Sequence, residues 1–348
     1  MKHQPVSTSV AVREADLRDD REAARIDAFV RDLGGSPFHL TGWSRAVERG
    51  CGQRARYLVA ERASVGIAGL LPLTEMRSKL FGRALVSTGF GVEGGVLGDA
   101  VEPLADAAWA LAGRLGAPEV ELRGGVPPRG WAVEDGQHLG FARSLAKDDD
   151  AELLAIPRKQ RAEVRKALAN DLEVAVGRDA ASLAEHHRVY AESVRNLGTP
   201  VFPAALFRAA VEALDADVLT VRHRGRAVAS VLSLYANGTV YPYWGGGTAA
   251  ARGLRANDRM YFALMAHARA RGCTRFDFGR SKVGSGPAAF KKNWGFEPTS
   301  LAYARRSDGP ARSVSPVDPK YRLMVRTWKK LPLPVANLIG PWIARGLG

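Results

Sequence analysis

Cysteine is scarce in this chain of 348 residues, because Cys51 and Cys273 are its two cysteines and lie far apart. Such a pair builds neither a disulfide framework nor a thiolate metal site, and it fits a reducing compartment. Long hydrophobic runs are missing too: no window approaches about 18 uninterrupted apolar residues, and the N-terminus has no stretch of the signal-peptide type. We therefore expect a cytoplasmic protein.

Several catalytic signatures are absent from the sequence, which has no G-x-S-x-G elbow, no P-loop and no H-E-x-x-H. His186 and His187 are adjacent and have no third ligand at metal-binding spacing, so no metal site is expected. The string GFGVEG at 89–94 matches G-x-G-x-x-G, but VLGDAVEP separates it from any helix. A dinucleotide site needs the helix N-terminus immediately, so we reject this motif.

Positive charge is abundant: 50 Lys and Arg residues oppose 36 Asp and Glu residues, giving a net charge of +14. Two interpretations fit this excess. One is long-range attraction to a polyanion, and the other is an Arg-rich solvated surface.

Periodicity indicates one mixed α/β unit that occurs twice. In the first half we predict strands at 56–61, 66–73 and 84–88, a helix at 104–115 and a strand at 119–123. In the second half we predict strands at 218–222, 227–234 and 240–244, a helix at 258–271 and a strand at 275–278. Entry helices at 43–49 and 205–214 precede the two sets.

A repeat of this length indicates two homologous domains rather than a solenoid. The predicted fold class is α/β (α+β), with mixed sheets flanked by helices. The acidic segment KDDDAE at 147–152 is the expected boundary. The predicted ranges are 1–147 for the first domain, 151–305 for the second and 306–348 for a basic, apolar tail.

A glycine-rich loop follows the third strand of the second unit, in YPYWGGGTAAARGLRAND. Tyr241 and Tyr243 are expected on one strand face, and a helix is expected to open after an Asn257 or Asp258 cap. Gly245–Gly247, with Gly246 at the centre, allow two interpretations: close approach of a ligand to the backbone, or a bulge that splays two strands.

A basic helix is predicted in IPRKQRAEVRKALAN, with Pro157 in its first turn. Its cations are Arg158, Lys159, Arg161, Arg165 and Lys166. Like charges at such spacing are mutually unfavourable, so either an anionic partner or a solvated basic face accounts for them. No aromatic residues are interleaved, which favours phosphate contacts over base stacking.

The stretch RFDFGRSKVGSGPAAFKKNWGFEP combines a strand, a polar loop and a short helix. The strand ends at Phe278, and the loop carries Arg280, Ser281 and Lys282. Lys291, between Phe290 and Trp294, fits two roles: stabilising an oxyanion or phosphate, or complementing a helix C-terminus.

The C-terminal segment mixes Arg326, Lys329, Lys330 and Arg345 with Trp328, Trp342 and aliphatic residues. This mixture suits an anionic membrane surface, while packing against the second domain is the alternative. Prolines at 332, 334 and 341 exclude one long helix.

Four segments resemble the FemAB-like acyltransferases, specifically the subgroup associated with exosortase/PEP-CTERM exopolysaccharide systems. These are IPRKQRAEVRKAL, ESVRNLGTPVFP, YWGGGT and DFGRSKVGSGPAAFKKNWGFEP. The resemblance implies tandem GNAT-like (BioF2-like acetyltransferase) domains, with the active site in the second and a degenerate scaffold as the candidate role of the first.

The resemblance also implies functions for individual residues. The family motif F-K-x-x-F/W-G falls on Phe290, Lys291, Trp294 and Gly295, which makes Lys291 the candidate for stabilising the carbonyl oxyanion. Asp277 is the nearest acidic candidate for a general base. The alternative is that Asp277 is a structural hydrogen-bond acceptor. The expected substrate-binding residues are Phe290, Arg158, Lys159, Arg161, Arg165, Arg195, Asn196, Thr199, Tyr243, Gly246, Arg280 and Lys282. For Arg195, Asn196 and Thr199, helix termination is the alternative.

The implied reaction is acyl or aminoacyl transfer to a peptidoglycan or exopolysaccharide precursor, with no tightly bound cofactor. Acyl-CoA and aminoacyl-tRNA both stay open as donors, because TAAARGLRAND offers only an offset version of the GNAT pyrophosphate loop R/Q-x-x-G-x-G/A. A peripheral contact with the inner membrane is also expected. The competing hypothesis is a non-catalytic protein that binds an anionic glycolipid or nucleic acid.

Overall fold

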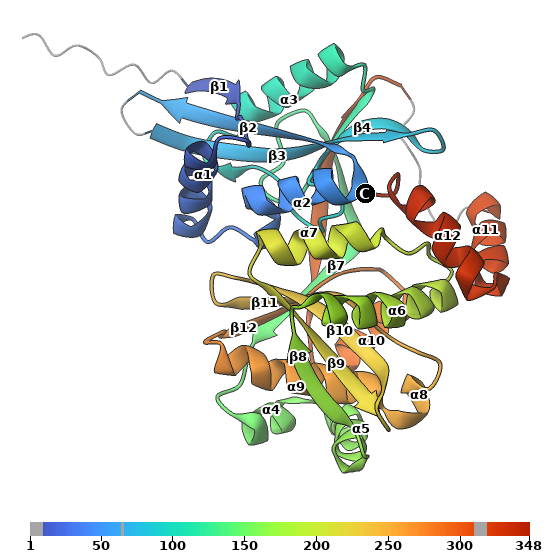
Figure 1. The fold of residues 1–348 in the computed structure, drawn as a ribbon. Helices are drawn as coiled ribbons and strands as arrows, with labels where there is room; N and C mark the ends of the chain where they lie inside the picture. The colour runs from blue at the N-terminus through green and yellow to red at the C-terminus, as the bar shows by residue number, and fades with distance from the viewer. Residues whose placement is uncertain (1–9, 64–65, 310–318) are drawn as a thin grey trace, which may run out of the picture. The chain divides into compact units, whose positions relative to one another are not determined.

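The computed structural model describes residues 10–63, 66–309 and 319–348, with side chains from 323 onward in the last range (Figure 1). The chain forms two compact units. Unit 1 comprises residues 1–135, 301–313 and 346–348, and unit 2 comprises residues 136–300 and 314–345.

Unit 1 is a mixed sheet flanked by helices. Its strands are β1 (Val10–Glu14), β2 (Arg54–Arg62), β3 (Gly66–Ser78), β4 (Gly82–Ser87), β5 (Leu97–Gly98), β6 (Glu119–Arg123) and part of β13 (Pro298–Ser307). Its helices are α1 (Asp20–Asp32), the 3-10 turn Pro37–His39, α2 (Thr41–Cys51) and α3 (Val101–Leu115). The strand order is β1-β2-β3-β4-β6-β13, with β5 beside β3. Among these pairs only β4 and β6 run parallel.

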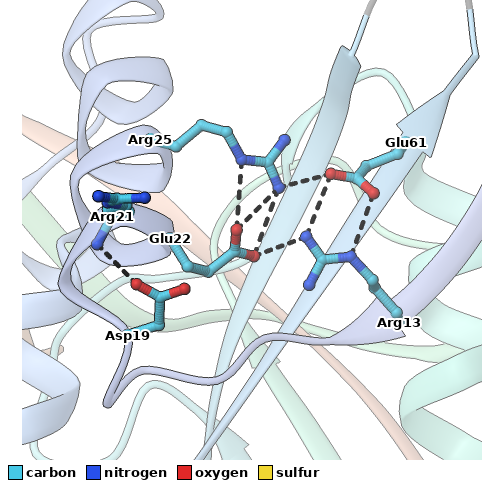
Figure 2. A network of polar contacts seen from close by, with 6 residues as sticks. All are labelled: Arg13, Asp19, Arg21, Glu22, Arg25 and Glu61. Carbon is cyan, nitrogen blue, oxygen red and sulfur yellow. Dashed lines mark hydrogen bonds and ion pairs between the residues drawn. The ribbon is translucent and has the colours of Figure 1, made fainter.

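Alternating side chains of β2 serve the two faces of this sheet. Leu58 packs with Leu104 and Leu111 of α3, whereas Tyr57 and its neighbours on that face pack with Ile26 of α1. At the surface, four charged residues tie α1 to β1 and β2, as Figure 2 shows. These are Arg13, Glu22, Arg25 and Glu61.

Unit 2 has the same plan. Its strands are part of β7 (Ala132–Ser144), β8 (Glu173–Gly177), β9 (Ala216–His223), β10 (Arg226–Ala236), β11 (Thr239–Gly247) and β12 (Arg275–Lys282). Its helices are α4 (Asp149–Ala155), α5 (Arg158–Ala169), α6 (Ala180–Leu197), α7 (Ala204–Ala213), α8 (Ala251–Leu254), α9 (Ala256–Ala270), α10 (Gly286–Asn293), α11 (Pro319–Lys330) and α12 (Leu333–Ala344). The order is β8-β9-β10-β11-β12-β7, and only β11 and β12 run parallel among these pairs.

The two faces of the unit 2 sheet carry different helices (Figure 1). Val231 and Phe276 pack with Met260 and other buried residues of α9 in the main core. On the opposite face, Ser230 lies 2.9 Å from Nδ1 of His186 in α6. His186 is therefore a buried structural residue of the helix and sheet interface.

The predicted repeat and fold class are confirmed, since every predicted strand and helix lies on an observed element. One predicted cap is wrong: α9 begins at Ala256 after Arg255, so Asn257 and Asp258 lie inside its first turn. Arg255 is already left-handed, with φ of +57°, and this turn ends α8 and starts α9 without a side-chain cap.

The sequence does not predict that the two halves exchange their last strands. β7 follows β6 in the chain but pairs with β12 in unit 2, and β13 follows β12 but pairs with β6 in unit 1. The compact units consequently divide between Asp135 and Gly136. The ranges 1–147 and 151–305 stay a prediction based on the sequence repeat.

The C-terminal segment forms two helices, α11 and α12, with the break at Leu331 and Pro332. Residues 310–318 of the predicted tail lie outside the described part of the chain. Within the described residues, no helix combines the length and the apolar character that crossing a membrane requires.

Candidate active site

The parallel strands β11 and β12 separate soon after they start. They pair at Thr239 with Arg275 and at Val240 with Phe276, and the structure records no further pair between them. β11 nevertheless continues to Gly247, paired on its other side with β10. The residues that follow Val240 and Phe276 therefore lie along two diverging strands.

A β-bulge interrupts β12 where it pairs with β7. The register with β7 shifts between Asp277 and Arg280, and Gly279 adopts φ of +66°, which glycine tolerates without strain. Residues 278 and 279 therefore lose regular ladder partners. Their freed backbone groups need other partners, because they are partly buried.

Asp277 and Lys291 supply those partners. The Gly279 N–H donates to Asp277 Oδ1 at 2.7 Å. The Lys291 ammonium in α10 donates to the carbonyl oxygens of Gly279, at 3.1 Å, and Arg280, at 3.0 Å. Both predicted catalytic residues thus hold the bulge, and Lys291 keeps one further N–H for another acceptor.

The Lys291 ammonium is buried among aromatic rings. It lies 5.4 Å from the ring centre of Phe141 and 5.8 Å from that of Phe278. Burial lowers the pKa of Lys291 to about 8, although the Asp277 carboxylate opposes this shift. Lys291 therefore carries most of a positive charge at neutral pH, in a site where charge is poorly screened.

Asp277 is partly buried and lies between the buried residues Phe276 and Phe278 of β12. Burial raises the pKa of Asp277, and the hydrogen bond from Gly279 works in the opposite direction. Its geometry is that of the structural acceptor that the sequence left open. A role in proton transfer stays a prediction.

Phe290 and Tyr261 form an aromatic cluster beside the diverging strands. The Tyr261 ring, in α9, lies 4.7 Å from Phe278 and 5.7 Å from Phe290. A Cβ placed on Gly245 of β11 would lie 3.1 Å from the Tyr261 hydroxyl. Sequence reasoning missed Tyr261, because one tyrosine in an amphipathic helix gives no signal.

The Tyr261 side chain connects the two diverging strands. Burial raises the pKa of Tyr261 to about 12, so the phenol is protonated. Its hydroxyl has no hydrogen-bond partner among the described residues. The hydroxyl is therefore available as a donor near the β11 backbone, and the ring of the same residue packs beside Phe290 of α10.

Gly246 has a packing role. A Cβ there would lie 2.5 Å from Cβ of Ser193 in α6, so the glycine allows that helix to approach the sheet. The bulge of β11 lies at Tyr243, because Trp244 pairs with Leu232 and Pro242 pairs with Ser233. The bulge interpretation of the three glycines is therefore wrong in position: they pair regularly with β10.

The N-terminus of α9 carries an acidic side chain. Asp258 Oδ1 accepts a hydrogen bond of 2.6 Å from Gln160 of α5. Burial raises the pKa of Asp258 to about 6, so the carboxylate is mostly ionised at neutral pH. A diphosphate at this helix terminus would meet favourable N–H groups together with a negative charge.

The predicted basic helix is confirmed as α5, but its cations differ from one another in their contacts. Arg161 donates to the backbone carbonyls of Leu154, at 2.8 Å, and Ile156, at 3.1 Å, and so caps α4. Lys166 pairs with Glu163 at 2.7 Å. Arg158, Lys159 and Arg165 are exposed and have no partner in the described part of the chain.

Arg195, Asn196 and Thr199 lie around the end of α6. Gly198 ends the helix in the left-handed conformation, and the Thr199 N–H donates to the Val194 carbonyl at 2.8 Å. Arg195 donates to the Lys329 carbonyl of α11 at 3.4 Å. This geometry agrees with the helix-termination alternative, and a role in acceptor binding stays a prediction.

The structure thus brings together Asp277, Arg280, Lys282 and Lys291. Burial lowers the pKa of both Lys282 and Lys291, and the Arg280 charge adds to each shift. Arg158, Lys159 and Arg165 lie on a different element, α5. The predicted substrate-binding residues therefore fall into more than one cluster.

Comparisons with known proteins agree with this architecture. Residues 158–292 match the model of the acetyltransferase (GNAT) domain. Among curated protein sequences, none matches the chain. In fold, the chain is similar to FemX, with a TM-score of 0.65 and 17% identity over 84% of this chain and 96% of that chain.

Two further solved structures are similar. L-PGS from Bacillus licheniformis aligns with a TM-score of 0.54 and 15% identity over 88% of this chain and 97% of that chain. A tandem GNAT protein from the clavulanic acid biosynthesis pathway aligns with a TM-score of 0.53 and 12% identity over 87% and 100%. The fold is that of tandem GNAT proteins, and unit 2 contains a GNAT-type domain.

Proposed function

We propose that unit 2 transfers an acyl or aminoacyl group to an amine on a cell-envelope precursor. The observation that carries this proposal is that the matched GNAT region contains the candidate site. The GNAT match at 158–292 spans the diverging strands β11 and β12 and the buried Lys291 ammonium beside them.

In the proposed reaction, the acceptor amine attacks the carbonyl carbon of an activated ester or thioester. A C–N bond forms, the C–O or C–S bond breaks, and the amine proton passes to solvent or to the leaving group. Two donors are available for the developing oxyanion: the Tyr261 hydroxyl and the remaining N–H of Lys291. Donors fixed before reaction stabilise such charge most effectively.

Unit 2 supports two donor classes. GNAT folds bind acyl-CoA, and the α9 N-terminus supplies N–H groups for its diphosphate. The Asp258 carboxylate weakens that site, and the exposed cations of α5 suit the phosphates of aminoacyl-tRNA. We place acyl-CoA first, because it needs no additional tRNA-binding element.

The acceptor is proposed from the proteins that the chain resembles. FemX and L-PGS share its fold, and a peptidoglycan or exopolysaccharide precursor fits the FemAB-like resemblance. Membership of the exosortase/PEP-CTERM subgroup, and a cytoplasmic location at the inner membrane, belong to this proposal. Non-catalytic binding of an anionic glycolipid or nucleic acid is the competing proposal. It is favoured by Arg158, Lys159 and Arg165 of α5, which are exposed and have no partner among the described residues.

Donor binding is tested by the thermal midpoint with millimolar coenzyme A. A ligand at about 100-fold over its Kd stabilises by about 2.7 kcal/mol, which shifts the midpoint by a few degrees. Asp258→Asn is expected to enlarge the shift, because it removes the charge at the α9 N-terminus. No shift in either protein would move the donor to aminoacyl-tRNA.

Catalysis is tested with two variants and a matched control. Tyr261→Phe and Lys291→Met are expected to lower the rate of transfer at least about 100-fold, the cost of removing one oxyanion donor. Lys292→Met, which alters the exposed neighbouring lysine of α10, is expected to leave the rate unchanged. Full turnover by both Tyr261→Phe and Lys291→Met would remove this site from the reaction. A wild-type protein that binds the ligand without turnover would favour the binding protein.

A further inference from the structure

One face of α12 is apolar and uncovered. Its exposed residues follow the spacing i, i+3, i+4, i+7, which places them on one side of a helix. They are Val335, Leu338, Ile339 and Trp342. The opposite side, with Ala336, Gly340 and Ala344, is buried. Leu338 is 80% exposed and Trp342 60% exposed, so these two side chains contribute little to the core.

Unit 2 holds this stripe in a fixed orientation. A Cβ on Gly340 would lie 3.1 Å from Val201, so α12 rests closely on the segment after α6. In α11, Val325 lies against Gly198, and Trp328 is buried. Because the small residues of α12 face inward, its large residues are directed outward.

Positive charge is concentrated in the same C-terminal segment as the apolar stripe. Residues 319–348 contain six Lys or Arg residues and no Asp or Glu. Arg326, Lys329 and Lys330 of α11 are exposed. Leu323, in the same helix, is 69% exposed. The helix pair α11 and α12 therefore carries large apolar side chains and cations and contributes no carboxylate side chain of its own.

We propose that α11 and α12 form a docking surface for an anionic lipid bilayer. Apolar side chains of this size gain free energy by entering the boundary between headgroups and acyl chains, and cations gain by approaching anionic headgroups. Tryptophan is suited to that boundary, because its ring is apolar and its N–H is polar. The helices lie on the bilayer, since neither is long enough to span it. This inference deepens the proposed location at the inner membrane by naming the surface that binds there, and its test does not depend on the transfer reaction.

A second copy of the chain is a poorer occupant. A symmetric interface brings the same patch of both copies together, so it would oppose the cations of α11 with one another. The net charge of +14 adds to this repulsion. An anionic bilayer satisfies the apolar stripe and the cations at once.

Co-sedimentation of the full chain with vesicles tests the surface. We expect binding to vesicles of phosphatidylcholine with about 30% phosphatidylglycerol, weakening as salt rises, and little binding to phosphatidylcholine alone. Leu338→Glu with Trp342→Glu is expected to weaken binding at least tenfold, and Lys329→Glu with Lys330→Glu by a similar factor. Val126→Glu and Lys147→Glu, at exposed sites in neither helix, are the matched controls.

Trp342 provides a direct signal, because none of the other six tryptophans is as exposed. Its fluorescence is expected to shift to shorter wavelength with anionic vesicles, and Trp342→Phe is expected to bind while losing the shift. Absence of wild-type binding would overturn the inference, as would unchanged binding by Leu338→Glu with Trp342→Glu. Concentration-dependent dimerisation that this variant abolishes would assign the surface to a second copy and also overturn it.

Discussion

Units 1 and 2 share a strand order, and each has one parallel pair of strands. The units differ in what the chain does after the last paired residues of that parallel pair. In unit 1, β4 pairs with β6 up to its own last residue, Ser87. In unit 2, β11 continues after its last pair with β12. The same topology therefore produces one pair that stops and one that diverges.

The chain of unit 1 packs where its parallel pair ends. In residues 88–95 the Gly89 carbonyl accepts from the Trp43 indole at 3.1 Å, and the Gly91 carbonyl accepts from Arg123 at 2.9 Å. The N–H groups of Gly94 and Gly95 donate to the Arg123 carbonyl. The GFGVEG string is thus part of the unit 1 core. This difference supports a scaffold role for unit 1 and a reaction in unit 2.

Removing the Arg123 side chain is expected to have the largest effect on stability. It donates to buried Glu121 at 2.7 Å, and the arginines around Glu121 lower the pKa of this carboxyl to about 2 despite its burial. Arg123→Met leaves buried groups short of partners, so we expect a loss of about 3 kcal/mol in the free energy of unfolding. Urea unfolding measures it.

Arg13→Met is the matched control for that change. Arg13 pairs with Glu22 and Glu61 at the surface (Figure 2), and exposed ion pairs are worth about 0–1 kcal/mol. Equal losses for both variants would mean that Arg123 does not hold residues 88–95. Coenzyme A binding by Arg123→Met should match that of the wild type, since the proposed site lies in unit 2.

Alkaline pH is expected to stabilise the folded protein through Lys291 of unit 2. The pKa of Lys291 falls from an ordinary 10.5 to about 8 on folding, so between these values the unfolded chain binds more protons. The penalty for burying the charge is complete below pH 8 and disappears as pH rises to 10.5. Relative to Lys291→Met, the wild type should gain on the order of 2 kcal/mol across this range. A parallel pH profile for the two proteins would contradict a buried ammonium, and Lys292→Met should follow the wild type.

The smallest expected effect on stability comes from alanine substitutions at two glycines, one in β11 and one in α8. Gly246→Ala forces a Cβ against Ser193, and such overpacking costs about 1–3 kcal/mol. Gly253→Ala, in α8, meets open space and should be neutral or stabilise by up to about 1 kcal/mol. Thermal midpoints compare them, and a neutral Gly246→Ala would mean that α6 does not approach β11 closely.

The sequence predicts the repeated elements well, because each is a local pattern. The helix at 104–115 ends at Gly116, which adopts the left-handed conformation, and EVELR is β6. The partners of strands are less accessible: nothing in the composition of β7 or β13 shows that they pair with the other half of the chain.

The candidate site was predictable only in part, because its residues form a local motif but their contacts depend on strand pairing. Lys291 and Asp277 stand out in a motif, but their joint support of the Gly279 bulge depends on a register shift that no spacing reveals. Arg161 looked like a ligand-binding cation, yet it caps α4. Tyr261 becomes visible only once β11 and β12 are known to diverge.

The exchange of β7 and β13 has a consequence for synthesis on the ribosome. Unit 1 receives its edge strand from residues 301–307, so β6 keeps an unpaired edge until most of the chain has been translated. An edge of that kind is prone to incorrect pairing. The nascent first half is therefore the species most in need of chaperone protection, and a gene cut between the halves would yield two fragments that each lack an edge strand of their own unit.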